Sequence, residues 1–143
     1  MIFLKNFLKN QKEPMNRMCF NFAMKKQLKI LDKAIEIASL LEGNKYKLCA
    51  IITDKRNKIL SIGVNSFVKT NPLQKKYADR LGEPDKIYLH SEISAIINLP
   101  YGSKPYNIYV ARVNRKKSFL AKPCPICQLA LKEIGIENIY YTK

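Results

Sequence analysis

The sequence predicts one α/β domain in which helices pack around a mixed sheet. Its 143 residues are the length of one ordinary domain, and 47% of them are apolar, which is enough for one buried core. Helix-like and strand-like apolar patterns follow one another in the order α, β, β, α, β, α, β, which is typical of α/β proteins. No apolar run approaches the ~20 residues that span a bilayer, so we expect no membrane partner.

The first half of the domain contains a long helix and a β-hairpin. Apolar side chains recur at steps of three and four residues from Ala23 to Glu42, and Gly43 follows as a C-terminal cap. Two apolar runs, Leu48 to Thr53 and Ile59 to Gly63, are separated by a polar turn and predict two paired strands. Residues 64–88 are polar and are predicted to form one long loop, of a length that often carries function.

The second half alternates short helices with strands. A helix is predicted from His90 to Leu99 and a strand from Asn107 to Val113, with a basic loop after it. A second short helix runs from Pro125 to Ile134, and a last strand from Ile136 to Tyr141. The Gly-Ile pair before this last strand indicates a parallel continuation of the sheet.

Residues 1–22 form a basic N-terminal extension ahead of the domain, which we place at residues 23–143. We expect an accessory, flexible segment there rather than a short amphipathic helix that touches a membrane or nucleic acid. No secretory signal is recognisable, so we expect a reducing cytoplasm in which Cys19 and Cys49 are free thiols.

The chain is strongly basic, because 26 lysine and arginine residues against 11 acidic ones give a formal net charge of +15. Such a charge bears on partners rather than on fold. It favours ligands that carry phosphate, either free nucleotides or single-stranded nucleic acid. A general lysine-rich bias of the source proteome explains the charge equally well. The sequence does not favour either interpretation over the other.

Three residues have the types and the spacing of a catalytic zinc site. Cys124 and Cys127 form a C-x-x-C pair, and His90 is the only histidine in the chain. One imidazole and two thiolates are three protein ligands, which leaves the fourth position of a tetrahedral zinc ion open for water. His90 and Cys124 each begin a predicted helix, where the helix dipole favours thiolate over thiol. A metal-free surface histidine with two buried cysteines is the alternative.

Glu92 follows His90 by two residues and is the candidate catalytic group. It lies in the same first helical turn and need not bind the metal. A carboxylate in this place can take a proton from a zinc-bound water and return it to the substrate. This residue is what separates a predicted enzyme from a zinc-binding scaffold.

The segments His90-Ser91-Glu92 and Pro123-Cys124-Pro125-Ile126-Cys127, in this order, resemble the signature of the zinc nucleobase deaminases. The chain is similar to the cytidine and deoxycytidylate deaminase superfamily over residues 23–143, and its tail from Cys127 to Ile136 looks more like the deoxycytidylate type. Gly63-Val64-Asn65 looks like the family's G-x-N element. The resemblance implies a three-layer α/β/α fold with a mixed four- to five-stranded sheet, one zinc ion per chain and self-association into a homo-oligomer. Because the chain stops at Lys143, we expect any fifth strand or C-terminal helix of the family to be missing.

The resemblance also implies roles for the substrate-binding residues. Asn65 would hold the sugar or help to fix the substrate, and the backbone N–H of Ser91 would meet the carbonyl of the base. The carbonyl of Pro123 would accept from the exocyclic amine. Water activated on zinc would attack the amine-bearing carbon, and Glu92 would protonate the ring nitrogen and the leaving ammonia.

Three hypotheses for the function follow. The first is deamination of cytosine in a free nucleotide such as dCMP. The second is deamination of cytosine or adenine within single-stranded DNA or tRNA, and the third is an inactive deaminase-like zinc-binding module. Candidate phosphate contacts are Arg112, Arg115, Lys69 and Lys122, and candidate base-stacking side chains are Tyr77, Tyr88 and Tyr101; each also has an ordinary interpretation as a solvated charge or as loop packing.

Overall fold

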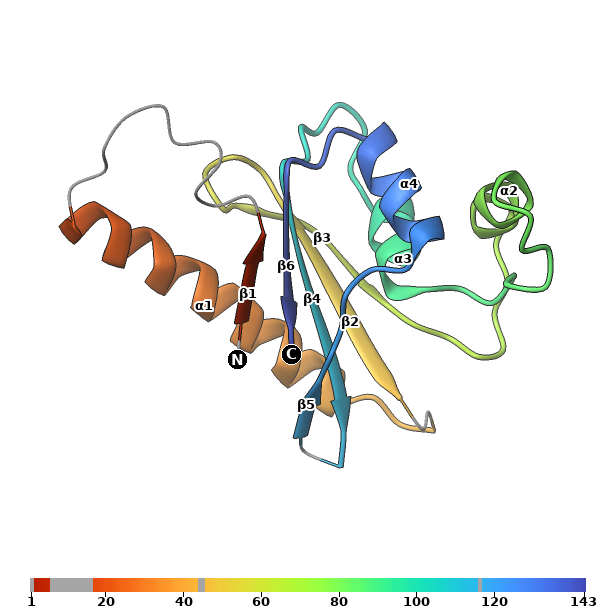
Figure 1. The fold of residues 1–143 in the computed structure, drawn as a ribbon, viewed down its shortest axis with the longest axis horizontal. Coiled ribbons are helices and arrows are strands. Elements are labelled where there is room, and N and C mark those ends of the chain that lie inside the picture. The colour runs from red at the N-terminus through yellow and green to blue at the C-terminus, as the bar shows by residue number, and fades with distance from the viewer. Residues whose placement is uncertain (1, 6–16, 44–45, 116) are drawn as a thin grey trace.

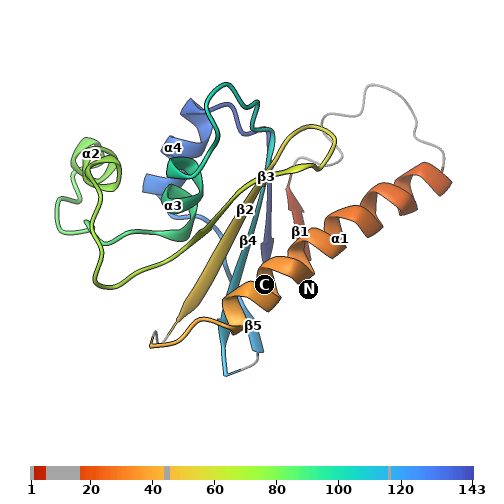
Figure 2. The same cartoon turned by 180° about the vertical axis from the view of Figure 1, so that it is seen from behind.

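The computed structural model describes residues 2–5, 17–43, 46–115 and 117–143, with side chains from Met24 onward. A mixed sheet forms the middle layer. Helix α1 (Arg17–Ser39) covers one face of the sheet, while α3 (Ser91–Ile97) and α4 (Pro125–Glu133) cover the other (Figure 1; Figure 2). The predicted three-layer α/β/α fold is confirmed.

The sheet is a continuous path of five strands in the order β1-β6-β4-β2-β3. Strand β2 (Lys47–Thr53) pairs antiparallel with both β3 (Ile59–Val64) and β4 (Asn107–Asn114). Strand β6 (Asn138–Thr142) runs parallel to β4, as the sequence indicated. Strand β1 (Ile2–Lys5) pairs antiparallel with β6. Strand β1 therefore supplies the fifth strand of this path, at the edge beside β6.

Several elements differ from the sequence prediction. Helix α1 begins at Arg17 instead of Ala23, and the stretch 64–88 contains a helix, α2 (Pro72–Arg80), where a single loop was predicted. The side chain of Asn71 caps α2 by accepting from Leu73 N at 2.9 Å. The predicted basic loop after β4 contains β5 (Lys117–Phe119), which pairs with β4 as a short arm. No helix in the described part of the chain is both long and apolar enough to cross a membrane.

Residue 1 and residues 6–16 of the N-terminal extension lie outside the described residues. The division into an extension (residues 1–22) and a domain (residues 23–143) therefore stays a prediction. Strand β1 and the first residues of α1 belong to the predicted extension.

Strand β4 shows how the two cores are divided. Successive side chains of a strand point to opposite faces of the sheet. Tyr109 and Ala111 pack with Leu31 of α1 on one face, whereas Ile108 and Val110 belong to the core beneath α3 and α4. Buried apolar side chains thus fill the space on both faces of the sheet, and the short helices α3 and α4 pack on its second face.

Gly63 fixes how closely α3 approaches the sheet. A β-carbon added at Gly63 would lie 2.1 Å from the backbone nitrogen of Ala95 and 2.3 Å from the carbonyl oxygen of Ser91. Beside it, the Ser61 hydroxyl donates to the carbonyl of Ala95 at 2.7 Å. A side chain at position 63 would therefore push α3, together with the residues at its start, away from the sheet.

Candidate metal centre and its pocket

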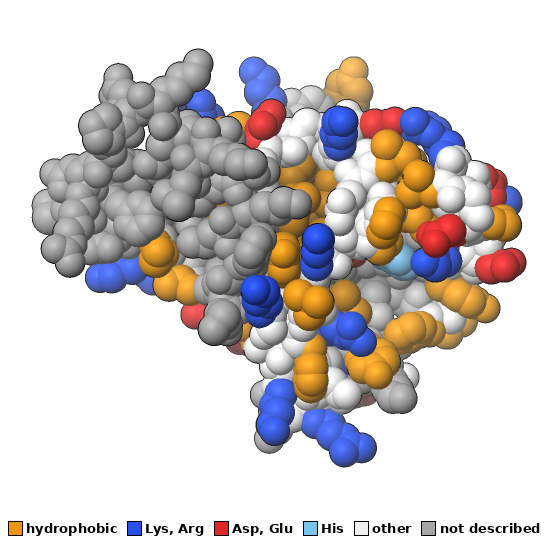
Figure 3. Space-filling view, in the orientation of Figure 1, with side chains coloured by type: hydrophobic (Ala, Val, Ile, Leu, Met, Phe, Trp, Pro, Cys, Tyr) orange, Lys and Arg blue, Asp and Glu red, His pale blue; other side chains and the backbone are white. Residues whose placement is uncertain are grey.

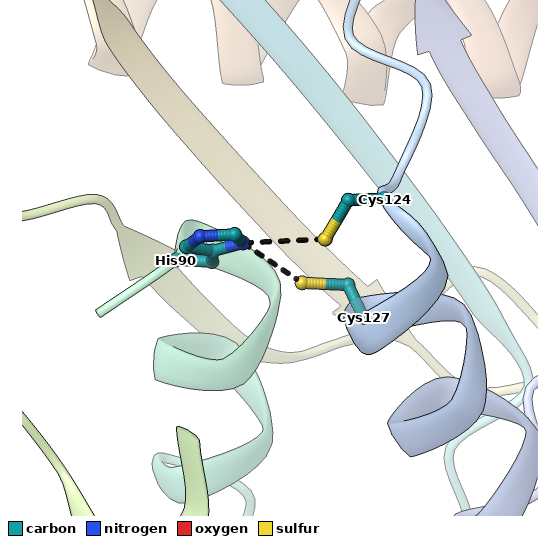
Figure 4. A group of neighbouring side chains, drawn as sticks. All are labelled: His90, Cys124 and Cys127. Atoms are coloured by element: carbon teal, nitrogen blue, oxygen red, sulfur yellow. Dashed lines mark hydrogen bonds between the residues drawn. The ribbon is translucent and has the colours of Figure 1, made fainter. Parts of the chain in front are cut away.

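Two helix starts bring the three predicted ligands together. His90 is the N-cap residue of α3 and Cys124 is the N-cap residue of α4, while Cys127 lies in the first turn of α4. The Nδ1 atom of His90 lies 3.3 Å from Sγ of Cys127 and 3.5 Å from Sγ of Cys124 (Figure 4). All three ligand atoms lie within 4.8 Å of one another.

These distances fit a zinc ion. Ordinary Zn–N and Zn–S bonds in a tetrahedron separate nitrogen from sulfur by about 3.5 Å, and the two separations here are 3.3 and 3.5 Å. A hydrogen bond from Cys127 lowers the pKa of Cys124 to about 4, so this sulfur is a thiolate at neutral pH. The same contact and burial raise the pKa of Cys127. A bound divalent cation would remove the shared proton and balance both sulfurs.

Glu92 lies beside the three ligands without being one of them. Its side chain is buried in the first turn of α3, and Ser91 Oγ donates to its Oε2 atom at 3.0 Å. Burial raises the pKa of Glu92, and its carboxyl is near enough to Cys127 to help raise the pKa of that thiol. A carboxyl held beside a metal site in this way can serve as a general acid and base.

The site opens into a pocket of about 480 Å³. Its walls include His90, Glu92 and Cys124, together with Asn65 from the end of β3 and Arg112 from β4. This volume is within the range of small-molecule sites. In the space-filling view the only histidine of the chain, in pale blue, is visible between hydrophobic and charged side chains, so the metal centre can be reached from this face (Figure 3).

Gln74 is a residue of this site that the sequence did not predict. Its side chain is fully buried on α2. Its Oε1 atom accepts from the backbone N–H of His90 at 3.2 Å, and its Nε2 atom donates to the carbonyl of Lys86 at 3.1 Å. One amide therefore ties the segment that carries His90 to α2. The polar composition of 64–88 concealed this residue, because a buried glutamine in an unrecognised helix gives no periodic signal.

Helix α2 is also tied to α4. Glu133, at the end of α4, accepts from the hydroxyl of Tyr77 at 2.5 Å and from Arg80 at 2.6 Å. Of the two interpretations of Tyr77, base stacking is excluded and packing holds, because its ring is buried on α2. Of the other two predicted tyrosines, Tyr88 lines the pocket, whereas Tyr101 follows the far end of α3 and does not line it.

The predicted substrate contacts are placed unevenly around the pocket. Asn65 and Ser91 line it, but the side chain of Asn65 already accepts from Leu48 N at 2.9 Å and donates to Tyr46 O at 3.1 Å. The carbonyl of Pro123 is not part of the wall, and it accepts from Gln128 Nε2 at 2.7 Å.

The predicted phosphate contacts divide in the same way. Arg112 and Lys122 line the pocket, while Lys69 and Arg115 do not.

Comparison with known families gives a match across most of the chain. Residues 24–143 match the model of the cytidine and deoxycytidylate deaminase zinc-binding region. No curated protein matches the chain. The matched region and the donor set of His90, Cys124 and Cys127 together assign one zinc ion to this site.

Proposed function

Because this chain belongs to the cytidine and deoxycytidylate deaminase family, we propose that it converts a cytosine base to uracil by hydrolysis, with release of ammonia. The proposed substrate is a free cytidine or deoxycytidine nucleotide such as dCMP, in keeping with the deoxycytidylate-like tail. The observation that carries the proposal is the buried carboxyl of Glu92 in the same pocket as the metal ligands. A site that only held zinc would have no use for this carboxyl.

In the proposed mechanism, a zinc ion held by His90, Cys124 and Cys127 would lower the pKa of a water molecule to about 7, so that this water would be a nucleophile at neutral pH. Glu92 accepts the proton of that water and delivers it to the ring nitrogen of cytosine. The water oxygen adds to the amine-bearing carbon as the ring nitrogen is protonated. Glu92 then takes the second proton from the hydroxyl group so formed and passes it to the amine, and the bond between this carbon and the amine breaks to release ammonia. The Ser91 hydroxyl donates to Glu92 Oε2, and this contact keeps the carboxylate turned toward the reacting atoms.

We also propose how this chain holds the substrate. The backbone N–H of Ser91 binds the carbonyl of the base, and the carbonyl of Pro123 accepts from its exocyclic amine. Pro123 itself is not in the wall of the pocket, but its neighbours Lys122 and Cys124 are. The Pro123 oxygen has two acceptor positions, so the bond that it accepts from Gln128 leaves one for the substrate. Asn65 acts on the sugar, or indirectly by holding Tyr46 and Leu48 in the wall of the pocket.

A polynucleotide substrate is the second candidate, whether the base is cytosine or adenine. Tyr88 and Phe67 line the pocket and are 48% and 50% exposed. Exposed aromatic rings at the mouth of a basic site can stack on the bases of single-stranded DNA or tRNA. The net charge of +15 would support backbone contacts.

We further propose that the protein works in the cytoplasm, as expected from the sequence, and as a homo-oligomer, as its family resemblance implies. The third candidate function, an inactive zinc-binding module, would need the same fold and the same three ligands but no proton transfer by Glu92.

Ammonia release from the zinc-loaded protein tests these candidates. The substrates are dCMP, CMP, cytidine and an oligonucleotide that contains cytosine and adenine. We expect release from a free nucleotide, and we expect Glu92→Gln to lower kcat by about 10²- to 10⁴-fold while one zinc ion per chain stays bound. No ammonia from any substrate, with zinc bound, would leave only the inactive module. Full activity of Glu92→Gln would refute the role of that residue.

A further inference from the structure

Arg112 occupies a position of β4 where the pattern of the strand calls for an apolar side chain. It follows Ile108 and Val110 at steps of two residues, so it lies on the face that α3 and α4 cover. Both of those residues are fully buried in the core of that face. A cation in such a row loses part of its hydration, which is costly unless a partner replaces the water.

The structure holds Arg112 in place from two sides. Its backbone N–H donates to Thr142 Oγ1 at 3.1 Å, and its guanidinium lies 4.1 Å from the centre of the Tyr46 ring. Asn65 in turn donates to the carbonyl of Tyr46. The guanidinium is therefore positioned before any ligand arrives, and this lowers the entropy that ligand binding would cost.

One donor of this arginine has no partner. The Nε atom of Arg112 is buried and makes no hydrogen bond within the described part of the chain. Buried donors are normally satisfied, so this donor in the wall of the pocket is open to an acceptor that a ligand would bring.

The two positively charged side chains Arg112 and Lys122 in the pocket wall are not neutralised by ion pairs with carboxylates of the described residues. Among the described residues, three ion pairs are formed: Lys75 with Asp79, Arg80 with Glu133, and Lys86 with Glu83. None of them includes Arg112 or Lys122, and both of these line the pocket. Two cations without a carboxylate partner thus lie in the same cavity as the metal ligands.

We propose that Arg112, with Lys122, forms an anion subsite that binds the phosphate of a mononucleotide substrate and makes the enzyme prefer nucleotides to nucleosides. This inference rests on the proposed deaminase function. The planar guanidinium offers two parallel donors to phosphate oxygens, and the lysine adds a second positive charge. In a cytosine nucleotide the phosphate is the only anionic group, so this subsite would recognise the part of the substrate that a nucleoside lacks.

The first test compares kcat/KM for dCMP and deoxycytidine in three proteins. We expect the wild type to prefer dCMP, and Arg112→Gln to reduce this preference by about 10- to 100-fold, the usual effect of losing a charge-assisted hydrogen bond. Lys122→Gln should reduce it less, because that lysine is a flexible point charge. The nucleoside rate of the same Arg112→Gln preparation separates a lost phosphate contact from a damaged fold. Equal losses on both substrates would overturn the proposal.

Arg115→Gln is the matched control. Arg115 lies three positions further along the chain, is exposed and does not line the pocket. Its substitution by glutamine removes the same charge as Arg112→Gln but does not alter the pocket. The preference for dCMP should therefore stay unchanged. An effect as large as that of Arg112→Gln would show that general charge, and not this subsite, attracts the nucleotide.

Binding measured without turnover separates this inference from the proposed function. In the Glu92→Gln background, calorimetry gives the Kd values of dCMP and deoxycytidine. Tighter binding of dCMP that is lost in Glu92→Gln/Arg112→Gln supports the subsite, even if the wild type releases no ammonia. Equal Kd values for dCMP and deoxycytidine overturn the subsite, even if the wild type is an active deaminase. Binding and turnover of the oligonucleotide in preference to dCMP would also overturn it.

Discussion

The two sides of the sheet each contain a buried cysteine, glutamine and tyrosine. Cys49, Gln27 and Tyr140 lie on the side of α1, whereas Cys127, Gln74 and Tyr77 lie on α4 and α2 on the other side. Cys49 lies in the apolar core against α1, where burial raises its pKa to about 12, whereas Cys127 faces His90 at 3.3 Å. Within the described part of the chain, the side chain of Gln27 bonds to the hydroxyl of Tyr140 alone, while the two ends of the Gln74 amide bond to the backbone of His90 and of Lys86. Burial of a polar side chain does not by itself mark function. The hydrogen-bond partners of that side chain distinguish a role at the metal centre from a role in the core.

Replacing the cysteine on each face should give the largest contrast. Cys127→Ser removes one of three zinc ligands, so we expect loss of stoichiometric zinc and of all deaminase activity. Cys49→Ser places a hydroxyl in an apolar core and should lower the free energy of unfolding by about 1–3 kcal/mol, with zinc content unchanged. Metal analysis and thermal unfolding of both variants check this. Zinc retained at one per chain in Cys127→Ser would remove that residue from the ligand set.

Replacing the glutamine on each face should give a smaller contrast. Gln74→Met keeps the length of the side chain but frees the backbone N–H of His90 and the carbonyl of Lys86. Because residues that orient a metal ligand typically contribute about 10- to 100-fold to metal affinity, we expect a loss in that range. Competition with a coloured chelator measures it.

Gln27→Met is the control for this contrast, since Gln27 is buried and bonded to Tyr140 on the opposite face. It should change the unfolding temperature without changing the affinity for zinc. The same zinc affinity in both variants would mean that α2 does not position His90.

The sequence predicted the metal centre better than its surroundings, and the reason is physical. His90, Cys124 and Cys127 are rare residue types at spacings that chemistry requires, so they are recognisable without knowledge of the fold. Gln74 and Tyr77 lie in a helix whose polar composition resembles a loop, and their roles depend on packing between segments far apart in the chain.

Arg112 lies between these two cases. Its charge made it a candidate phosphate contact from the sequence alone. Its contact with the ring of Tyr46 arises only when β2 pairs with β4, and no local pattern in the chain predicts that pairing. Lys69 and Arg115 were equally good candidates by charge, and only the fold separates them from Arg112.

Replacing the tyrosine on each face should give the smallest contrast. Tyr77→Phe removes one donor to Glu133 and loosens α2 from α4, so we expect the unfolding temperature to fall by a few degrees. The hydrogen bonds from Tyr77 and Arg80 lower the pKa of Glu133 below its ordinary value of 4.5. A lowered carboxyl pKa stabilises the fold above the ordinary value, and this stabilisation disappears as the pH falls through the lowered value. The difference between wild type and Tyr77→Phe should therefore be full at pH 7 and shrink below pH 4.5.

Tyr140→Phe is the matched control for this pH dependence. The hydroxyl of Tyr140 accepts from Gln27 Nε2 and is bonded to no carboxylate in the described part of the chain. Its substitution should lower the unfolding temperature by an amount that does not vary between pH 7 and pH 4. Acid releases zinc from every one of these proteins, so each variant is compared with the wild type at the same pH. If the effect of Tyr77→Phe were equally constant with pH, the bond from Tyr77 to Glu133 would not be what links α2 to α4.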